Sequence, residues 1–335
     1  MSGAPATRPP LLYLGAEDVR RALPMRAAVE AMREAFRDLA NGAVAMPPRT
    51  RMANPEGDEV SLIMSSRSNG ISRLGVKLIT LYDRNRTIGL PLAQALFMLV
   101  DGQTGVPLAI FDGASLTALR TGAVSGLATD VLARPGGAVA AIFGAGVQAR
   151  AQLEAIAAVR PIREARVFDP IAPAAEAFAA EMSGRLSVLV HPASDPAAML
   201  QGADIVCTAT NSRTPLFADG DIAPGTHINA VGVYQPERAE IPAETVRRAR
   251  TVVDQTGAAL EEAGDLLQPL AAGMIDRSRF DLTLGDILIG RAEGRRSPAE
   301  ITLFKSVGLA VQDLYAAARA YDNALRLGVG RELER

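Results

Sequence analysis

The feature that most constrains this chain is a short apolar run, residues 138–143 (AVAAIF), that leads directly into 144–149 (GAGVQA) and then into a helical pattern. This is the pattern G-x-G-x-x-A between a strand and a helix. Gly144 permits a tight turn, Gly146 lets the backbone approach a pyrophosphate, and Ala149 allows the helix to pack closely on the strand. The helix N-terminus then offers unpaired N–H groups to phosphates. The segment therefore predicts a dinucleotide-binding unit.

Strands and helices alternate regularly from this point on. Runs with strand character lie at 138–143, 165–169, 186–191, 204–210, 227–232 and 251–255, and helical patterns lie at 148–159, 172–182 and 195–203. Such alternation implies a doubly wound, mainly parallel sheet. Asp169 closes the second run, 25 residues after Gly144, where an acidic side chain would hold an adenosine ribose 2′-OH. Asp169 would repel a 2′-phosphate, and Pro170 follows it rather than an arginine, so NAD is favoured and NADP is the alternative.

The first third of the chain has a different pattern. Helical spacing at 17–40, ended by Asn41-Gly42, predicts one helix. Strand-like runs separated by turn signals predict an antiparallel or mixed sheet, and they lie at 60–66, 74–82, 92–100 and 107–113. Further helical patterns occupy 115–133 and 301–328. We therefore predict an α/β protein in which a Rossmann-type doubly wound sheet spans 119–305. A smaller α+β domain spans 1–118, and the C-terminal helix, 306–335, packs back on it.

Composition narrows the function classes. The 335 residues allow two domains, and 48% hydrophobic with 21% charged residues is typical of a globular protein. A net charge of −2 gives no electrostatic footprint for nucleic acid. The longest apolar run, 90–100, is about half a bilayer span and no signal peptide is visible, so we expect no membrane partner. Cys207 alone cannot form an internal disulfide, and no Cys and His residues have metal-ligand spacing, so we expect a cytoplasmic protein without a metal.

Lysine is rare in this chain. Of 35 basic residues only Lys77 and Lys305 are lysine, and the rest are arginine. A compact ammonium, whose pKa shifts readily, can do what a guanidinium cannot. The alternative is that the two lysines are surface residues that remain by chance. The sequence around each lysine has to distinguish a functional role from this alternative.

Seven segments of the chain resemble, in order and over nearly its full length, the ornithine cyclodeaminase/mu-crystallin family. They are MPPRTR (46–51), LGVKLIT (74–80), DGASLTALRTGAVSGLATDVLARP (112–135), IFGAGVQAR (142–150), ADIVCTAT (203–210), PGTHINAVG (224–232) and ITLFKSVGLAVQDL (301–314). The resemblance implies a Rossmann domain joined to a smaller substrate-binding and dimerisation domain, and a homodimer. It also implies one of three activities: ornithine cyclodeamination with recycled NAD, reduction of cyclic ketimine acids, or alanine dehydrogenation.

The resemblance further implies the site residues. Arg49, Lys77 and Arg120 would grip the substrate carboxylate as the catalytic cluster, which suits a forked guanidinium and a point-charge ammonium. The implied cofactor-binding residues are Thr121, Gly144, Gly146, Val147, Gln148, Asp169, Thr208, Asn229, Ala230, Val231, Gly232, Lys305, Ser306, Val307 and Gly308. Packing explains Ala230 and Val231 equally well, and Lys305 has either a cofactor role or a structural one. We expect a structural hydrogen bond at His227 and a surface loop at His191.

The sequence departs from the family's cyclodeaminases at two carboxylates. Tyr234 stands where they carry an aspartate, and tyrosine, with a pKa of ~10, is no base at neutral pH. Leu62 is the best match to a glutamate that holds the distal amine of ornithine, although Glu59 lies close by. Leu92 replaces a Thr or Ser of relatives, which removes a hydroxyl near the cofactor. The expected site then consists of cations that bind a carboxylate, a nicotinamide and an apolar wall. Such a site suits a cyclic imine acid.

We therefore predict an NAD(P)-dependent oxidoreductase that reduces a small cyclic ketimine carboxylate. Δ1-Pyrroline-2-carboxylate would give proline, and Δ1-piperideine-2-carboxylate would give pipecolate. Three alternatives stay open. They are a cyclodeaminase in which another residue or a water replaces the missing aspartate, an alanine-type amino-acid dehydrogenase, and a non-catalytic binding protein like mu-crystallin.

Overall fold

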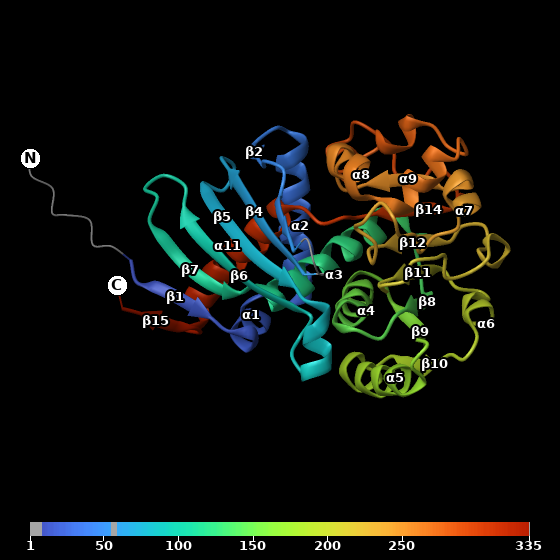
Figure 1. Cartoon of the computed structure of the whole chain (residues 1–335), viewed down its shortest axis with the longest axis horizontal. Coiled ribbons are helices and arrows are strands. Elements are labelled where there is room, and N and C mark those ends of the chain that lie inside the picture. Colours follow the sequence, from blue (N-terminus) through green and yellow to red (C-terminus); the bar gives the residue numbers. More distant parts are fainter. Residues whose placement is uncertain (1–8, 55–58, 335) are drawn as a thin grey trace, which may run out of the picture. The chain divides into compact units, whose positions relative to one another are not determined.

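A computed structural model describes residues 9–54 and 59–334 of the chain (Figure 1). Residues 1–8, part of the segment in which no signal peptide is expected, lie outside them. The described residues form two compact units. Unit 1 comprises those up to Arg120 together with those from Ala310, and unit 2 comprises Thr121–Leu309. The first division falls inside helix α3 (Gly113–Leu132), as the predicted boundary at 118/119 does, and the second follows Leu309, where the sequence predicts 305/306.

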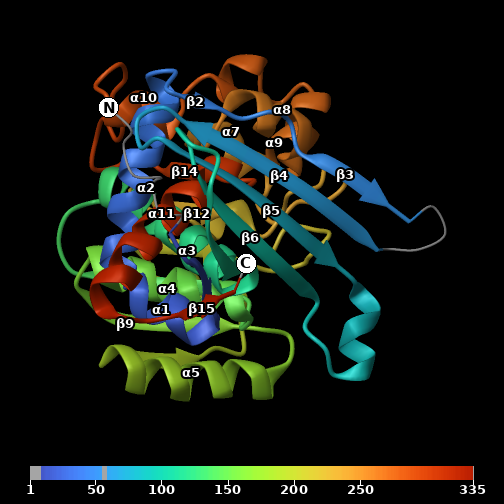
Figure 2. The same cartoon turned by 90° about the vertical axis from the view of Figure 1, so that its left-hand side faces the viewer.

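Unit 1 is built on an eight-stranded mixed sheet. Its strand order is β15-β1-β7-β6-β5-β4-β2, with β3 paired to β4, and of the described pairs only β1–β7 is parallel. The strands are β1 (Leu11–Leu14), β2 (Val44–Ala45), β3 (Thr50–Ala53), β4 (Val60–Ser68), β5 (Arg73–Leu81), β6 (Ala93–Asp101), β7 (Pro107–Asp112) and β15 (Arg331–Leu333). A 3₁₀ helix, η1 (Asp83–Ile88), joins β5 to β6 at the far end of these strands (Figure 2). The antiparallel or mixed sheet predicted from residues 60–113 is confirmed: the strands of that range pair antiparallel, and β1 adds the parallel pair.

The two faces of this sheet differ in burial. Side chains alternate between the faces along a strand, and one face carries buried residues such as Leu62, Met64 and Ile79. Helix α11 (Ala310–Leu327) packs on β4 and β5, and α2 (Met25–Ala40) packs on α11. Several large apolar side chains of β3 to β6 are exposed instead: Met52, Ile63, Leu78, Leu96 and Met98.

The single helix predicted at 17–40 is wrong in one respect. The segment forms two helices, α1 (Ala16–Ala22) and α2, which are separated at Leu23 and Pro24. Proline lacks a backbone N–H and disfavours helical backbone at the residue before it. The apolar periodicity continues across the break because both helices bury one face.

The C-terminal helix is also shorter than predicted. It begins at Ala310, not at 301 or 306, because 302–305 form an additional strand of unit 2. Gly308 then adopts φ +81°, a left-handed backbone that a continuous helix does not contain. The helix ends at Leu327, and the chain closes with strand β15.

Unit 2 is a Rossmann-type parallel sheet of seven strands. The order is β10-β9-β8-β11-β12-β14-β13, and every pair is parallel. The strands are β8 (Ala138–Phe143), β9 (Ile162–Phe168), β10 (Leu189–Pro192), β11 (Ile205–Thr208), β12 (His227–Ala230), β13 (Arg250–Val253) and β14 (Thr302–Lys305). The strand order reverses between β8 and β11, which is where open α/β sheets bind ligands beyond the carboxyl ends of the strands.

Two apolar clusters of unit 2 cover the sheet, one beside α4 and α5 and the other around α7 to α9. The helices are α4 (Val147–Val159), α5 (Ala172–Leu186), α6 (Pro196–Leu200), α7 (Ala243–Arg248), α8 (Thr256–Glu262), α9 (Gly264–Ala271) and α10 (Leu284–Leu288), with 3₁₀ turns η2 (Asp219–Asp221) and η3 (Arg277–Phe280). The doubly wound fold predicted from the sequence is confirmed. Within the described part of the chain, no helix has both the length and the apolar character that a membrane crossing requires.

Candidate functional site

The loop between β8 and α4 fits a dinucleotide phosphate group. Gly144 has φ +96°, and a Cβ there would lie 2.6 Å from the Ala209 carbonyl oxygen, so this position requires glycine. Gly146 precedes α4 without a side-chain cap, and a Cβ there would meet nothing within 4 Å. Val147 is 71% exposed. The loop thus presents open backbone at the N-terminus of a 13-residue helix, an arrangement that binds phosphate.

Asp169 directly follows β9 and holds the same loop. Its Oδ2 accepts the Ala145 N–H at 2.9 Å, and its Oδ1 accepts the Ile171 N–H at 2.9 Å. Gln148, in the first turn of α4, has a buried Oε1 with no hydrogen-bond partner among the described residues. A buried acceptor of this kind needs a ligand or a water as its partner. The residues that the sequence assigns to the nucleotide phosphates and ribose therefore lie around one loop.

Lys77, Arg120 and Asp313 form a buried ionic cluster in unit 1. Lys77 lies on β5, Arg120 on α3 and Asp313 in the first turn of α11. The Nζ of Lys77 is 2.6 Å from Oδ2 of Asp313, and the Nε of Arg120 is 3.0 Å from Oδ1. Exposure of these side chains is 1% for Lys77, 7% for Arg120 and 0% for Asp313. One carboxylate therefore compensates two buried cations.

The electrostatics of this cluster favour loss of a proton from Lys77. Burial lowers the pKa of Lys77 to about 8; Asp313 opposes the shift, and the charges of Arg120 and Arg49 add to it. Burial raises the pKa of Asp313, but the two cations outweigh it and hold that pKa below its usual value. Arg49, between β2 and β3, is half-buried. Asp313 is therefore ionised at neutral pH, whereas Lys77 titrates close to neutrality.

Gln312 extends the cluster by one residue. Its Oε1 accepts a hydrogen bond from Nη1 of Arg120 at 2.6 Å. Arginine only donates, so this contact fixes which way the amide points. The Nε2 of Gln312 is buried and has no hydrogen-bond partner within residues 9–54 and 59–334. Gln312 thus orients Arg120 and leaves a donor for which the described chain supplies no acceptor.

The wall beside Lys77 is apolar. Met64 pairs with Lys77 across β4 and β5, and Leu62, two residues along β4, shares that face. Glu59 precedes β4, and its Oε2 accepts a hydrogen bond from Nδ2 of Asn54 at 2.8 Å. The Glu59 carboxylate therefore pairs with Asn54, and the buried wall carries Leu62 and Met64.

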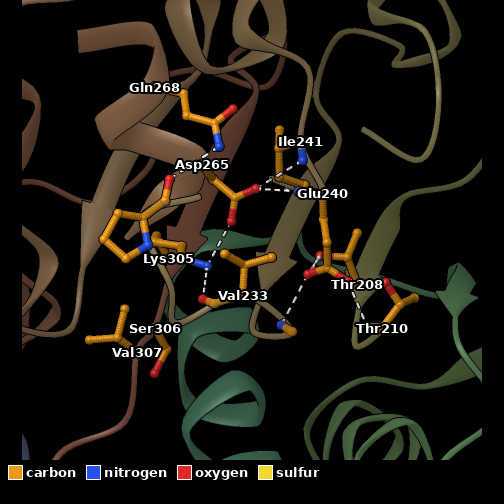
Figure 3. A network of polar contacts seen from close by, with 12 residues as sticks. Thr208, Thr210, Val233, Glu240, Ile241, Asp265, Gln268, Lys305, Ser306 and Val307 are labelled. Carbon is orange, nitrogen blue, oxygen red and sulfur yellow. Dashed lines mark hydrogen bonds and ion pairs between the residues drawn. The ribbon is translucent and has the colours of Figure 1, made fainter. Parts of the chain in front are cut away.

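Lys305 ends β14 and is completely buried (Figure 3). Its Nζ donates to Oδ2 of Asp265 at 2.7 Å and to the Val233 carbonyl oxygen at 2.6 Å. The Oδ1 of Asp265 accepts the N–H groups of Glu240 and Ile241 at 2.6 and 3.0 Å. The lysine therefore ties β14, α9 and the segment after β12 together, and a contact with the cofactor remains a proposal.

Glu240 bridges the carboxyl ends of β11 and β12 (Figure 3). Its Oε2 accepts the Thr208 hydroxyl at 2.9 Å and the Gly232 N–H at 3.0 Å. Its Oε1 accepts the N–H and the hydroxyl of Thr210 at 2.7 and 2.6 Å. A Cβ at Gly232 would lie 2.4 and 2.5 Å from the two carboxylate oxygens. The Thr210 carbonyl oxygen would also lie 2.5 Å from it, so the backbone of Thr210 and the carboxylate of Glu240 together require glycine at position 232.

Asp254 holds the turn that follows β14. Its buried Oδ2 accepts the Ser306 hydroxyl at 2.9 Å, the Val307 N–H at 2.8 Å and the Gly308 N–H at 3.0 Å. Burial raises the pKa of Asp254, and these hydrogen bonds lower it in part. The resemblance assigns Ser306, Val307 and Gly308 to the cofactor, and in the structure their polar hydrogens bind the Asp254 carboxylate. Their contacts with a cofactor stay a prediction.

Asn229 and His227 belong to a buried hydrogen-bonded chain. The Nδ2 of Asn229 donates to the Thr129 hydroxyl at 2.9 Å, and its Oδ1 lies 3.2 Å from Nε2 of His227. The Nδ1 of His227 lies 2.9 Å from the Thr302 hydroxyl. Burial lowers the pKa of His227 to about 3, so the ring is neutral and structural, as expected. His191 is exposed but belongs to β10, so its assignment to a loop is wrong.

Four remaining positions complete the expected set. Thr121 follows Arg120 in α3 and is partly buried. Ala230 ends β12 with no exposed surface, and Val231 follows it half-buried; both positions suit packing, and their cofactor contacts stay a prediction. Tyr234 is 38% exposed in the segment after β12.

Four buried carboxylates escaped the sequence reasoning: Glu240, Asp254, Asp265 and Asp313. Each receives a hydrogen bond from a residue that the sequence did single out. A signal existed for Asp313, because Gln312 and Asp313 interrupt an otherwise apolar helical stretch. An acidic residue on the apolar face of a helix is rarely buried without a partner.

The parallel sheet with its glycine loop, joined to a unit with a buried ionic cluster, defines a two-domain protein with a Rossmann-type nucleotide fold. Within that class, the chain belongs to the ornithine cyclodeaminase/mu-crystallin family, whose model matches residues 12–327. The family expected from seven sequence segments is thus confirmed.

Individual relatives are similar over nearly the whole chain. Delta(1)-pyrroline-2-carboxylate reductase of Bacillus cereus is 36% identical over 325 residues, which cover 97% of this chain and 100% of that protein. The structure of Thermococcus litoralis Delta(1)-pyrroline-2-carboxylate reductase in complex with NADH and L-proline has a TM-score of 0.93 and 40% identity, and covers 96% of this chain and 100% of that one. The structure of an archaeal alanine dehydrogenase dimer with bound NAD has a TM-score of 0.89 and 33% identity. That match covers 97% of this chain and 99% of the other. The expected likeness to ketimine reductases is confirmed.

The ionic cluster yields a prediction for stability. Asp313→Asn leaves Lys77 and Arg120 buried with only a neutral partner, and should cost about 3–5 kcal/mol of unfolding free energy. Asp322→Asn, an exposed position on the same helix, is the matched control and should change stability by less than about 0.5 kcal/mol. Denaturant unfolding measures both. Equal stability of the two variants would contradict the cluster as described.

Proposed function

We propose that this chain is an NAD(H)-dependent reductase of small cyclic imine carboxylates, with Δ1-pyrroline-2-carboxylate as the first substrate to test and Δ1-piperideine-2-carboxylate as the second. The observation that carries the proposal is the buried cluster of Lys77, Arg120 and Asp313 beside the apolar Leu62 and Met64. The two oxygens of Asp313, the one carboxylate of the cluster, already pair with Lys77 and Arg120. The cluster therefore has no unpaired carboxylate to bind a side-chain amine of the substrate. Relatives named for pyrroline-2-carboxylate reduction support the choice.

Reduction of a C=N bond requires a proton on nitrogen and a hydride on the neighbouring carbon. Bound NADH supplies the hydride. Arg120 uses Nε and Nη1 for Asp313 and Gln312, and its remaining N–H groups, with Arg49, bind the substrate carboxylate. Lys77 holds the transferable proton on Nζ, and its pKa of about 8 makes that proton available near neutrality.

The nucleotide is held by the glycine loop and Asp169 in this proposal. Open backbone at Gly146 and the first turn of α4 suit the pyrophosphate. Asp169, beside that loop, favours a ribose 2′-OH over a 2′-phosphate, so NAD is preferred and NADP is the alternative. The residues present therefore fit a nicotinamide dinucleotide.

Assembly as a homodimer, and action in the cytoplasm, belong to the same proposal. Ile63, Leu78 and Leu96 lie in register across β4, β5 and β6, and all three are exposed. A continuous apolar patch of this kind is typical of a protein interface, and a second copy of the chain supplies a matching one. The archaeal alanine dehydrogenase relative is a dimer. Cys207, the only cysteine, is a buried free thiol, which suits a reducing compartment.

The function is tested by a substrate panel. Cyclic imine acids of both ring sizes should oxidise NADH, whereas pyruvate with ammonia should do so slowly, and ornithine with NAD should release no ammonia. NADH absorbance and an ammonia assay measure these outcomes. Robust ornithine cyclodeamination would overturn the argument from Tyr234 and Leu62. Preference for pyruvate would favour the alanine dehydrogenase alternative, and no turnover at all would favour the binding protein.

Lys77 variants test the proton donor. Lys77→Ala should lower kcat/KM by on the order of 10²–10⁴, and Lys77→Arg should lose nearly as much, because a planar fork cannot occupy a point-charge site. NADH binding should survive both changes. Arg73→Ala, at the first residue of the same strand and paired with Asp101, is the control and should retain turnover. Near-normal activity of the arginine variant would make Lys77 an ordinary cation.

The pH profile follows from the lowered pKa of Lys77. The reduction needs the ammonium form, so kcat/KM should be constant below pH 8 and fall about tenfold per pH unit above it. Proline oxidation needs the neutral amine and should rise through the same region. The residual activity of Lys77→Arg should lack this limb, which separates Lys77 from titration of the substrate. A wild-type profile without a limb up to pH 9.5 would contradict the assignment.

Asp169→Ala tests the nucleotide site. The variant should weaken NADH binding more than NADPH binding, because it removes the ribose contact and also relieves repulsion of a 2′-phosphate. Loosening of the glycine loop would weaken both cofactors alike, so the ratio of the two dissociation constants is the measurement. Asp195→Ala, which removes a helix cap elsewhere in unit 2, should leave the ratio unchanged. An unchanged ratio in Asp169→Ala would show that the aspartate serves the loop alone.

A further inference from the structure

Glu240 is a buried carboxylate for which the proposed mechanism has no use. It has no exposed surface, and its four hydrogen bonds come from Thr208, Thr210 and Gly232 at the carboxyl ends of β11 and β12. Each carboxylate oxygen accepts one backbone N–H and one hydroxyl. Backbone N–H groups can only donate, so this set of partners suits the ionised form.

The charges around Glu240 do not cancel it. Asp265 and Lys305 pair with each other at 2.7 Å, which leaves the negative charge of Glu240 in excess. Burial and the Asp265 charge raise the pKa of Glu240, whereas Thr210 and Lys305 lower it. Its charge also acts on Cys207 of β11, whose pKa rises through burial and through Glu240. The negative charge of Glu240 therefore acts electrostatically on a neighbouring group of β11.

This position matters because of what parallel sheets bind. Ligands lie beyond the carboxyl ends of the strands at the point where the strand order reverses, and here that point is between β8 and β11. The β8–β9 side carries the glycine loop and Asp169, so the other half of a dinucleotide falls to the β11–β12 side. Loss of a hydride with its two electrons leaves the nicotinamide ring with a positive charge, whereas the reduced ring is neutral.

We propose that Glu240 is a positioning residue that acts electrostatically: its buried charge stabilises the oxidised over the reduced nicotinamide and so makes bound NADH a stronger hydride donor. The inference rests on the proposed function only for the presence of a nicotinamide dinucleotide. Glu240 touches no substrate. It acts through Thr208 and Gly232, whose polar hydrogens it accepts, and through its field.

The test is the ratio of dissociation constants for NAD⁺ and NADH, measured on the full chain by calorimetry. Glu240→Gln should raise the Kd of NAD⁺ about tenfold relative to that of NADH, because it removes a unit negative charge that attracts the oxidised ring at an effective dielectric of about 20. Glu240→Ser is a second neutral variant, because its small hydroxyl leaves room for water to satisfy the backbone N–H groups. Either neutral variant suffices if the other does not fold.

Two charge controls separate the field from loosened packing. Glu240→Asp keeps the charge but shortens its reach, so both affinities can fall while their ratio stays within about twofold of wild type. Asp204→Asn removes a carboxylate at the amino ends of the same strands, where it accepts the Val139 N–H. Its ratio should also stay within about twofold. A purely structural Glu240 would weaken NAD⁺ and NADH equally in every variant.

The inference would be overturned if the ratio of the two dissociation constants stayed unchanged in Glu240→Gln and Glu240→Ser. It would also be overturned if Glu240→Asp shifted that ratio as much as the neutral variants do. Neither result affects the reductase proposal, which is judged by the substrate panel. A wild-type chain that binds neither cofactor would overturn both. A chain that binds both cofactors but reduces no imine acid overturns the reductase proposal and leaves the ratio to decide on Glu240.

Discussion

The arrangement of unit 1 depends on the carboxylate of Asp313. It joins a strand of the sheet, the helix that follows the sheet and the last long helix of the chain through ion pairs with Lys77 and Arg120. Each ion loses its hydration on burial, and only the compact geometry of the three groups offsets that cost. The same burial lowers the pKa of Lys77 to about 8, so the constraint that holds α11 on the sheet also sets the proton chemistry of the lysine.

The two positions at which this chain keeps a lysine have a physical explanation. Lys77 and Lys305 are buried, and each places its Nζ within 2.7 Å of a carboxylate oxygen. Such positions take a compact point charge at the end of a thin stem, whereas a planar guanidinium needs a wider space and several acceptors. Arginine serves nearly everywhere else in the chain. The alternative that both are surface lysines left by chance is therefore wrong. Lys77 pairs with Asp313 in unit 1, and Lys305 pairs with Asp265 in unit 2.

Local sequence patterns predicted the parallel sheet, the glycine loop and the mixed sheet, because each depends on periodicity and turn residues over a few positions. They failed where a distant partner decides. The sequence pattern assigns β14 to a helix, since its residues TLFK are compatible with both structures and only pairing with β12 and β13 selects the strand. The break at Pro24 was visible but was outweighed by the apolar spacing on either side of it.

The candidate site shows the same division. The cations were found because a resemblance and an unusual composition marked them, but their carboxylate partners lie up to 236 residues away, and nothing around the cations themselves indicates which carboxylate they pair with. Gly232 illustrates the consequence. The resemblance assigns it to the cofactor, and in the structure its missing Cβ leaves space for the Thr210 carbonyl oxygen and the Glu240 carboxylate, to which its N–H donates. A glycine at a strand end can therefore be required by groups of the chain itself, here a backbone carbonyl and a buried carboxylate, as well as by the approach of a ligand.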